Sequence, residues 1–182
     1  MNEGLIPGRY AKALYKFACE QGESDAVYAR MKMLTASFDA QPALRKAVEN
    51  RFLPAADKEK VLLTAASAPA KAGDCLAKFI QLVIGHNRED YMREIALAYQ
   101  RLYRDANGIA QVEIVTAHKL DDDQLEKIVA VVRQQLAGKK IEQTQRVDAG
   151  LIGGFVVKVD SLLLDASIKN ELKKLRLKLL SK

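Results

Sequence analysis

The sequence predicts a mostly α-helical protein, with an N-terminal six-helix bundle over residues 1–105 followed by a small α+β C-terminal domain over residues 106–182. Two observations lead to this fold class. Apolar residues recur at the three- and four-residue spacing of amphipathic helices throughout the first 105 residues. At Asn107-Gly108 the spacing changes to the alternation of a half-buried strand. A chain of 182 residues is long enough for two such small domains.

Glycine and proline residues separate the six expected helices. In the first helix Tyr10, Leu14 and Phe17 share one face, and Gly22 is expected to end the helix. The expected helix starts are Pro7, Ser24 as a cap, Pro42, Pro54, the end of the break from Pro69 to Gly73, and a position near Glu89. Short helices joined by short loops are typical of a bundle.

The first and fifth helices carry more apolar surface than a bundle core requires. The first adds Ala11 and Tyr15 beside its main stripe, and the fifth adds Cys75, Leu82 and Ile84. Such a helix either lies at the centre of a bundle or binds a partner, and periodicity alone leaves both interpretations open. In the second interpretation a groove between the two helices accepts a third helix. The candidate walls of this groove are Tyr10, Ala11, Leu14, Tyr15, Phe79, Leu82 and Val83.

The second half alternates strands with helices. Residues 110–116 form the first expected strand, and the acidic residues Asp121 to Asp123 begin a helix that Gly138 is expected to end. Residues 141–147 are polar and are predicted to form an edge strand.

The chain is expected to end in a hairpin and a helix. Phe155, Val157 and Val159 form a strand, Asp160-Ser161 supplies the turn, and Leu162 to Leu164 return as the hairpin partner. A last helix is predicted from Asp165. It carries a narrow apolar seam of the kind that packs against another helix, formed by Ile168, Leu172, Leu175 and Leu179 at 4-3-4 spacing.

Three glycines, Gly150, Gly153 and Gly154, lie directly ahead of the valine-rich strand. Crowded glycines form many phosphate-binding loops, but those loops follow a strand and precede a helix. Here the strand follows the glycines. We therefore interpret them as a tight turn or bulge at the start of a strand.

The residue types that carry catalysis or bind metals do not form a recognisable motif. His86 and His118 have no nucleophile motif nearby and are interpreted as loop residues. Cys19 and Cys75 lie in helical apolar patterns without metal-ligand spacing. Asp121 to Asp123 suit a helix N-terminus better than a calcium loop. We expect a binding or structural protein that is not an enzyme and has no cofactor and no metal site.

Charge and hydropathy exclude further classes. The net charge of +6 is spread evenly, with +3 on residues 1–105 and +3 on residues 106–182, so neither half is a basic arm for nucleic acid. The local basic excess is at the carboxyl end, where six cations from Lys169 to Lys182 accompany the single acid Glu171. No apolar run approaches the ~20 residues that span a bilayer, and the first ten residues lack signal-peptide order.

Three parts of the sequence resemble one known family. Residues 147–158, VDAGLIGGFVVK, followed by Leu164-Asp165-Ala166-Ser167-Ile168, are similar to the signature of the delta subunit of bacterial F-type ATP synthase, a relative of the mitochondrial oligomycin-sensitivity-conferring protein. Residues 9–14, RYAKAL, resemble the opening helix of that family, and Asn87-Arg88 falls where the family turns between its fifth and sixth helices. Ala166 stands where the family usually has Gly, which leaves the tightness of that turn in question.

The resemblance implies a non-catalytic stator subunit that links the catalytic head to the peripheral stalk, so that proton-driven rotation is coupled to ATP synthesis. It implies that the bundle binds the amino-terminal helix of an alpha subunit, which favours the groove interpretation. It also implies that the C-terminal domain contacts the b subunits, with Leu172, Leu175 and Leu179 as candidates, and that Gly150, Gly153 and Gly154 belong to a structural hairpin. The subunit would be peripheral on the cytoplasmic face of the cell membrane, and neither inserted in the membrane nor a homo-oligomer.

One alternative comes from another class of protein. A small cytoplasmic adaptor or RNA-associated protein could use the basic last helix as a surface for acidic partners. Binding of that kind would weaken steeply with salt, whereas a helix held in an apolar groove would survive moderate salt.

Overall fold

The computed structural model describes residues 4–67, 74–117, 121–135, 140–148, 150–151, 153–159 and 162–180. Several predicted features lie outside these residues: the break from Pro69 to Gly73, His118, the helix stop at Gly138, and the turn at Asp160-Ser161. The chain divides into two compact units, Met1–Tyr103 and Arg104–Lys182, which are treated separately below. Among the described helices none is both long enough and apolar enough to cross a membrane.

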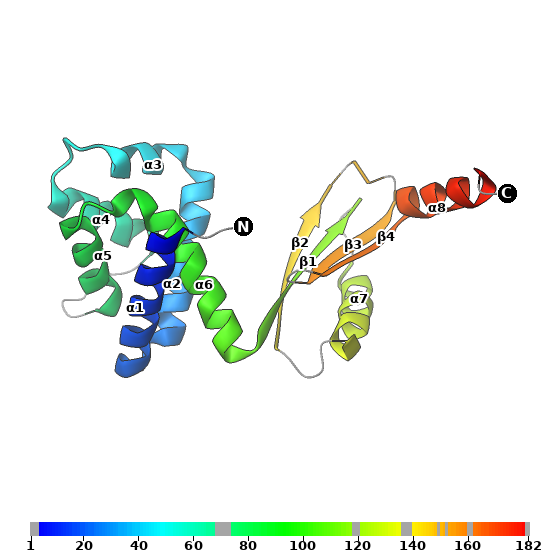
Figure 1. Cartoon of the computed structure of the whole chain (residues 1–182), viewed down its shortest axis with the longest axis horizontal. Helices are drawn as coiled ribbons and strands as arrows, with labels where there is room; N and C mark the ends of the chain where they lie inside the picture. The colour runs from blue at the N-terminus through cyan, green and yellow to red at the C-terminus, as the bar shows by residue number, and fades with distance from the viewer. Residues whose placement is uncertain are drawn as a thin grey trace. The chain divides into compact units, whose positions relative to one another are not determined.

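The first unit is helical, as its spacing predicts (Figure 1). Its elements are α1 Leu5–Gln21, α2 Ser24–Ala40, α3 Pro42–Glu49, α4 Ala55–Ala65, α5 Cys75–Gly85, the short 3-10 helix η1 Glu89–Tyr91, and α6 Met92–Asn107, which continues into the second unit. The predicted sixth helix thus begins as a single 3-10 turn before it becomes α-helical at Met92.

Glycine and proline act at the helix ends largely as expected. Gly22 ends α1 with φ 69°, a left-handed conformation that glycine adopts without the steric cost of a Cβ atom. Pro42 occupies the first turn of α3, where its missing N–H has no helical partner to lose. The prediction that Ser24 caps α2 is wrong. Ser24 is the first residue of the helix, and its hydroxyl is 3.3 Å from the Asp25 carboxylate.

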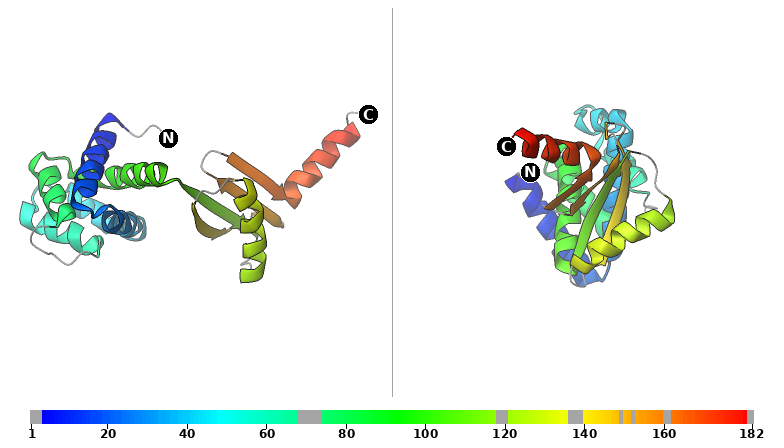
Figure 2. Two further views of the ribbon diagram at one scale, coloured as in Figure 1. Left: turned by 90° about the horizontal axis from the view of Figure 1, so that it is seen from below. Right: turned by 90° about the vertical axis from the view of Figure 1, so that its right-hand side faces the viewer.

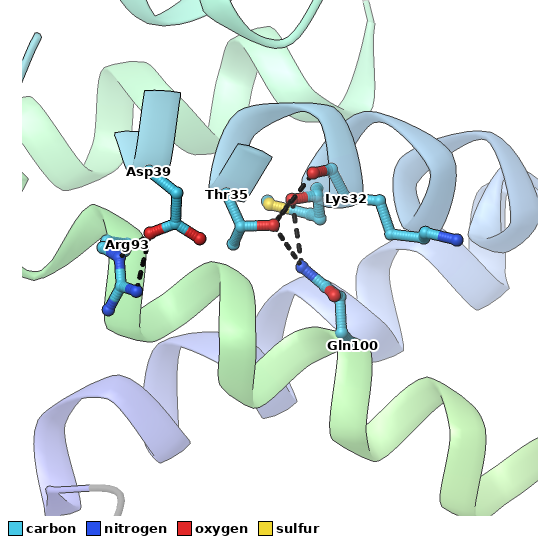
Figure 3. A network of polar contacts seen from close by, with 6 residues as sticks. Lys32, Thr35, Asp39, Arg93 and Gln100 are labelled. Atoms are coloured by element: carbon cyan, nitrogen blue, oxygen red, sulfur yellow. Dashed lines mark hydrogen bonds and ion pairs between the residues drawn. The ribbon is translucent and has the colours of Figure 1, made fainter. Parts of the chain in front are cut away.

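A polar network fixes α6 against α2 inside the apolar core (Figure 3). The Gln100 side-chain amide is buried and donates to the Met31 carbonyl at 3.1 Å and to the Thr35 hydroxyl at 3.0 Å. The Thr35 hydroxyl in turn donates to the Lys32 carbonyl at 2.8 Å. Two turns from Gln100, at the surface, Arg93 donates to Asp39 at 2.8 Å, and these two side chains are 39% and 62% exposed. Buried donors with matched acceptors specify one register between two helices, which apolar contacts alone would not.

A buried ion pair joins α4 to η1. Lys58 Nζ lies 2.5 Å from Glu89 Oε1, and the two side chains are only 6% and 10% exposed. The other Glu89 oxygen is buried and has no hydrogen-bond partner among the residues that the structure describes. Since a charge left alone in such a place is strongly destabilising, each residue depends on the other.

The second unit is a four-stranded sheet with one helix on it (Figures 1 and 2). The strands are β1 Ile109–Thr116, β2 Lys140–Val147, β3 Gly154–Val159 and β4 Leu162–Ser167, in the order β2-β1-β3-β4. The helix α7, Asp122–Gln135, connects β1 to its parallel neighbour β2, and β3 and β4 pair as an antiparallel hairpin. The predicted polar edge strand is confirmed as β2.

Helix α7 covers one face of this sheet. Val129 and Val132 on α7 form a core with Val112, Ile114 and Val157 on the central strands. The opposite face is charged: Glu113 Oε2 lies 3.3 Å from Lys158 Nζ, and Glu113 Oε1 lies 4.0 Å from Arg146. The alternation predicted for residues 110–116 therefore separates a face packed under α7 from one that carries charges, although Val115 on the charged face is itself only 7% exposed.

The start of the last helix differs from the prediction. Helix α8 spans Ile168–Leu180, whereas Asp165 belongs to β4 and pairs with Val156. The Asp165 carboxylate accepts from the Ser167 N–H at 2.9 Å, and the Ser167 hydroxyl caps α8 by accepting from the Asn170 N–H at 3.3 Å. Ala166 also lies in the ladder, opposite Phe155, so it is a strand residue and not a turn residue. The sequence Asp-Ala-Ser thus contains two possible caps, and pairing with β3 decides between them.

Gly154 is the position in this hairpin where no other residue fits. It is the first residue of β3, with φ 79°, and it lies opposite Ser167. A Cβ atom there would lie 2.4 Å from the Ala166 carbonyl oxygen and 3.0 Å from Ser167 Cα, both of which are backbone atoms that do not move aside easily. The close approach of β3 to the end of β4 therefore requires glycine.

We predict that Gly154→Ala lowers the free energy of unfolding of the second unit by about 3 kcal/mol or more, because it adds a backbone clash to the strain of a positive φ. Gly108→Ala is the matched control, since Gly108 has φ 61° with nothing within 4 Å of the added Cβ atom. It should cost only about 1–2 kcal/mol. Hydrogen exchange of the β1 and β3 amides measures both; equal losses would show that the close approach at Gly154 does not matter.

Candidate docking surfaces

Helix α1 carries two apolar stripes side by side. The stripe that faces the bundle core is buried and consists of Pro7, Ala11, Leu14 and Ala18. The second stripe consists of Ile6, Tyr10, Ala13 and Phe17, which are half-buried or exposed. Both stripes have helical spacing, so their apolar positions overlap in the sequence pattern and read as one broad apolar face.

Helix α5 belongs mainly to the core. Leu76, Ile80 and Val83 are completely buried, and Phe79 is 6% exposed. Two of its apolar residues differ: Leu82 is 49% exposed and Ile84 is half-buried. Most of α5 thus lies in the core, and Leu82 is its most exposed large apolar side chain.

Tyr10 connects the second stripe of α1 to α5. Its ring meets the Phe79 ring edge-on at 6.3 Å and the His86 ring at 6.4 Å, and its hydroxyl lies 3.3 Å from His86 Nδ1. Leu82 lies three residues from Phe79 and four from His86, so it is on the same face of α5 as both. We call the surface formed by Ile6, Tyr10, Ala13, Phe17 and Leu82 the α1–α5 surface.

The seven residues predicted to line a groove separate into three groups. Tyr10 and Leu82 lie on the α1–α5 surface. Ala11, Leu14, Phe79 and Val83 are buried in the core and offer a partner no surface. Tyr15 lies on another side of α1, where its ring meets the Tyr99 ring of α6 edge-on at 6.1 Å. Burial and a hydrogen bond with Cys19 raise the pKa of Tyr15.

Three members of this surface are not among the predicted groove residues. Ala13 and Phe17 stand in the predicted helical pattern without being distinguished from the core stripe, whereas Ile6 precedes Pro7, the expected helix start, because α1 begins at Leu5. His86, expected to be an isolated loop residue, contacts Tyr10 from 76 residues away. The sequence does indicate a second apolar stripe, because α1 has more apolar positions than a single core-facing stripe would contain.

A second exposed apolar surface runs along β4 and α8. The predicted seam residues Ile168, Leu172, Leu175 and Leu179 are 47%, 55%, 55% and 78% exposed. Leu163 and Leu164 on β4 are 62% and 45% exposed, and as neighbouring strand residues they point to opposite faces of the sheet. Soluble monomers rarely expose this many large apolar side chains in one segment, so this segment, which we call the β4–α8 surface, is a candidate interaction site.

The glycine-rich segment positions the start of α8. The Ile168 N–H donates to the Gly153 carbonyl at 3.0 Å, and a Cβ atom on Gly153 would come within 2.6 Å of Ile168 Cδ1. Hydrogen bonds from Ser167 lower the pKa of the neighbouring Asp165 carboxyl. The glycines thus lie at the open end of the β3–β4 hairpin.

The same segment is poorly suited to hold a phosphate. The Gly150 N–H already donates to Asp148 Oδ1 at 2.8 Å, and the Leu151 N–H donates to the Asp148 carbonyl at 3.1 Å. A phosphate loop needs free backbone donors and a helix N-terminus directly after them. Here Gly154 opens a strand.

We predict that Leu82→Asp leaves the first unit folded, with a melting temperature within a few degrees of wild type, because half of that side chain already faces solvent. Ile80→Asp is the matched control on the same helix. It buries a carboxylate without a partner and should cost several kcal/mol. Far-ultraviolet circular dichroism during heating compares the two, and unfolding of Leu82→Asp at the Ile80→Asp temperature would place Leu82 in the core.

Comparisons with known proteins agree along the whole chain. The family model described as ATP synthase delta (OSCP) subunit matches residues 6–179. The ATP synthase subunit delta of Parabacteroides distasonis is 37% identical over 180 residues, which cover 99% of this chain and 98% of the relative. That of Desulforamulus reducens is 34% identical over 183 residues, covering 100% and 99%.

A solved structure shares the fold. A chain in the cryo-EM structure of the Toxoplasma gondii mitochondrial ATP synthase hexamer superposes with a TM-score of 0.74, covering 97% of this chain and 98% of that one. The sequence identity is 19%, so this likeness concerns the fold alone.

Proposed function

The chain belongs to the ATP synthase delta (OSCP) subunit family, and we propose that its first unit holds the catalytic head of the enzyme while its second unit holds the peripheral stalk. As a delta-family subunit it is part of the stator, which links the head to the stalk while proton flow turns the rotor. Its work is mechanical, and the chemistry of ATP synthesis belongs to other subunits.

The observation that supports this division is that each compact unit exposes an apolar surface of its own. The α1–α5 surface belongs to Met1–Tyr103, and the β4–α8 surface belongs to Arg104–Lys182. A tether must bind two bodies at once, and two separate surfaces on two separately folded units allow this.

The partner of the α1–α5 surface is the amino-terminal helix of an alpha subunit. Two neighbouring helices that present a shared apolar strip accept a third helix along it, with anchors at three- and four-residue spacing. Tyr10 and Leu82 supply the anchors from the two sides. The Tyr10 ring is held in place by Phe79 and His86, so little conformational freedom is lost when a partner binds.

The partners of the β4–α8 surface are the b subunits of the stalk. A chain that holds both parts of the stator is peripheral on the cytoplasmic face of the cell membrane, placed there by its partners. The RNA-associated alternative is not favoured, because the family match extends from residue 6 to residue 179 and includes the basic α8.

Leu82→Asp should weaken binding of an alpha-subunit amino-terminal peptide at least ~100-fold, equivalent to about 2.7 kcal/mol, because the peptide would bury a carboxylate against apolar side chains. Calorimetric titration of the full chain measures it. Leu97→Asp is the matched control: Leu97 is 40% exposed on α6, and its variant should bind like wild type. Unchanged affinity for Leu82→Asp would remove Leu82 from the site.

Deleting residues 168–182, which removes α8 and spares all four strands, should abolish capture of the b subunits while head binding persists. Conversely, a fragment of residues 1–105 should bind the alpha-subunit peptide nearly as tightly as the full chain and fail to bridge head and stalk. Pull-down from detergent extract, with identification of the recovered subunits, reads both. Capture of b by the 1–105 fragment would show that the two units have the opposite roles.

A further inference from the structure

We propose that α8 pairs with a partner helix whose apolar heptad seam is flanked by acidic residues, so that charge selects the partner as well as apolar burial. This inference rests on the proposed function, in which the partner belongs to the peripheral stalk, and it specifies the chemistry of that contact.

The geometry of α8 is that of one strand of a coiled coil. The 4-3-4 spacing of Ile168, Leu172, Leu175 and Leu179 assigns them alternately to the d and a positions of a heptad, which lie within a narrow strip of the helix surface. Every side chain described from Glu171 to Leu179 is exposed, so the strip is not covered by the rest of its unit. An exposed heptad seam of this kind can pack against the heptad seam of a second helix.

The junction with the sheet fixes where the seam begins. The Ile168 N–H is bonded to Gly153, the Ser167 hydroxyl caps the helix, and the Asn170 side chain donates to the Asp165 carbonyl at 3.2 Å. Helix α8 therefore leaves the end of β4 in a defined direction and extends away from the sheet (Figures 1 and 2). A preformed helix loses less entropy on pairing than a disordered one would.

The flanks of the seam are mainly basic. Lys169 and Arg176 occupy e positions on one side. Glu171 occupies a g position on the other side, and its carboxylate is already 3.0 Å from Lys174 Nζ. Over residues 168–182 the sequence has six cations and one acid. Since residues at e and g set partner choice through charge, an acidic partner is favoured.

The same charges disfavour a second copy of α8 as the occupant. Pairing two copies would place Lys169 and Arg176 against an equally basic helix, and like charges beside a seam destabilise it. A membrane surface is also a poorer fit. An interfacial helix needs a wide apolar face. The apolar seam of α8 is a narrow strip of a and d positions, and the exposed Leu177 occupies an f position on the opposite side of the helix.

The test uses the full chain and two synthetic helical peptides with the same leucine seam, one with Glu and the other with Lys at every e and g position. Fluorescence anisotropy of labelled peptide should show at least ~10-fold tighter binding of the Glu peptide, weakening between 50 and 300 mM NaCl as a screened charge contact does. The double variant Lys169→Glu/Arg176→Glu should lose or reverse this preference. Its matched control is Lys173→Glu/Lys174→Glu, which changes the net charge equally on the sides of α8 away from the seam and should keep the preference.

Equal affinity for the two peptides, or a preference that Lys169→Glu/Arg176→Glu leaves intact, would overturn the proposal. So would an α8-dependent dimer in sedimentation, or binding to phosphatidylglycerol vesicles in place of the peptides. Pull-down of stalk subunits separates this inference from the tether function. If Lys169→Glu/Arg176→Glu captures them as wild type does, the tether function stands and the charge selection does not.

Discussion

Helix α1 has more apolar surface than its own bundle buries, and the head-binding role proposed for the first unit depends on this constraint. A helix packs its neighbours through one stripe, and the core already takes Ala11, Leu14 and Ala18. The adjacent stripe through Tyr10 and Phe17 is covered in part by α5, where the Tyr10 ring packs on Phe79 and its hydroxyl lies within hydrogen-bond distance of His86. Under the proposed function a partner helix covers what remains exposed, and burial of this apolar excess contributes to the driving force for assembly.

The second unit leaves a surface uncovered for a related reason. Four strands offer two faces, but α7 covers only one, and the other is solvated by charges such as Glu113 and Lys158. Helix α8 follows β4 without a turn of intervening chain, because Gly154 lets β3 approach the last residues of β4 and Ser167 caps the helix at once. The helix is thus directed outward, with its leucine seam available.

The sequence was sufficient to predict where the helices and strands lie, but not which side of each helix faces the core. Periodicity and the positions of Gly22 and Pro42 predicted the helices of the first unit, because local chain geometry determines both. Overlapping stripes on α1 could not be separated, since adjacent stripes differ by a fraction of a turn and only packing shows which one faces inward. The start of α8 was missed because Asp165 and Ser167 are both good caps, and a strand pairing with Val156 made the choice. Contacts such as Lys58 with Glu89 or Tyr10 with His86 leave no local signature at all.

The boundary between the two compact units, between Tyr103 and Arg104, falls inside the continuous helix α6, so under the proposed function α6 carries load from one unit to the other. A helix that carries load must resist sliding along its neighbours. Apolar ridges on two packed helices resist such sliding only weakly, because the helices still bury apolar area after one has shifted along the other. The hydrogen bonds of Gln100 to Met31 and Thr35, with Arg93 bound to Asp39 two turns away, have one register in which all donors are matched (Figure 3). Sliding by one turn would leave the buried Gln100 amide unpaired, at a cost of about 1–3 kcal/mol. The buried contacts of Gln100 therefore fix the register of α6, the helix that under the proposed function connects the head-binding unit to the stalk-binding one.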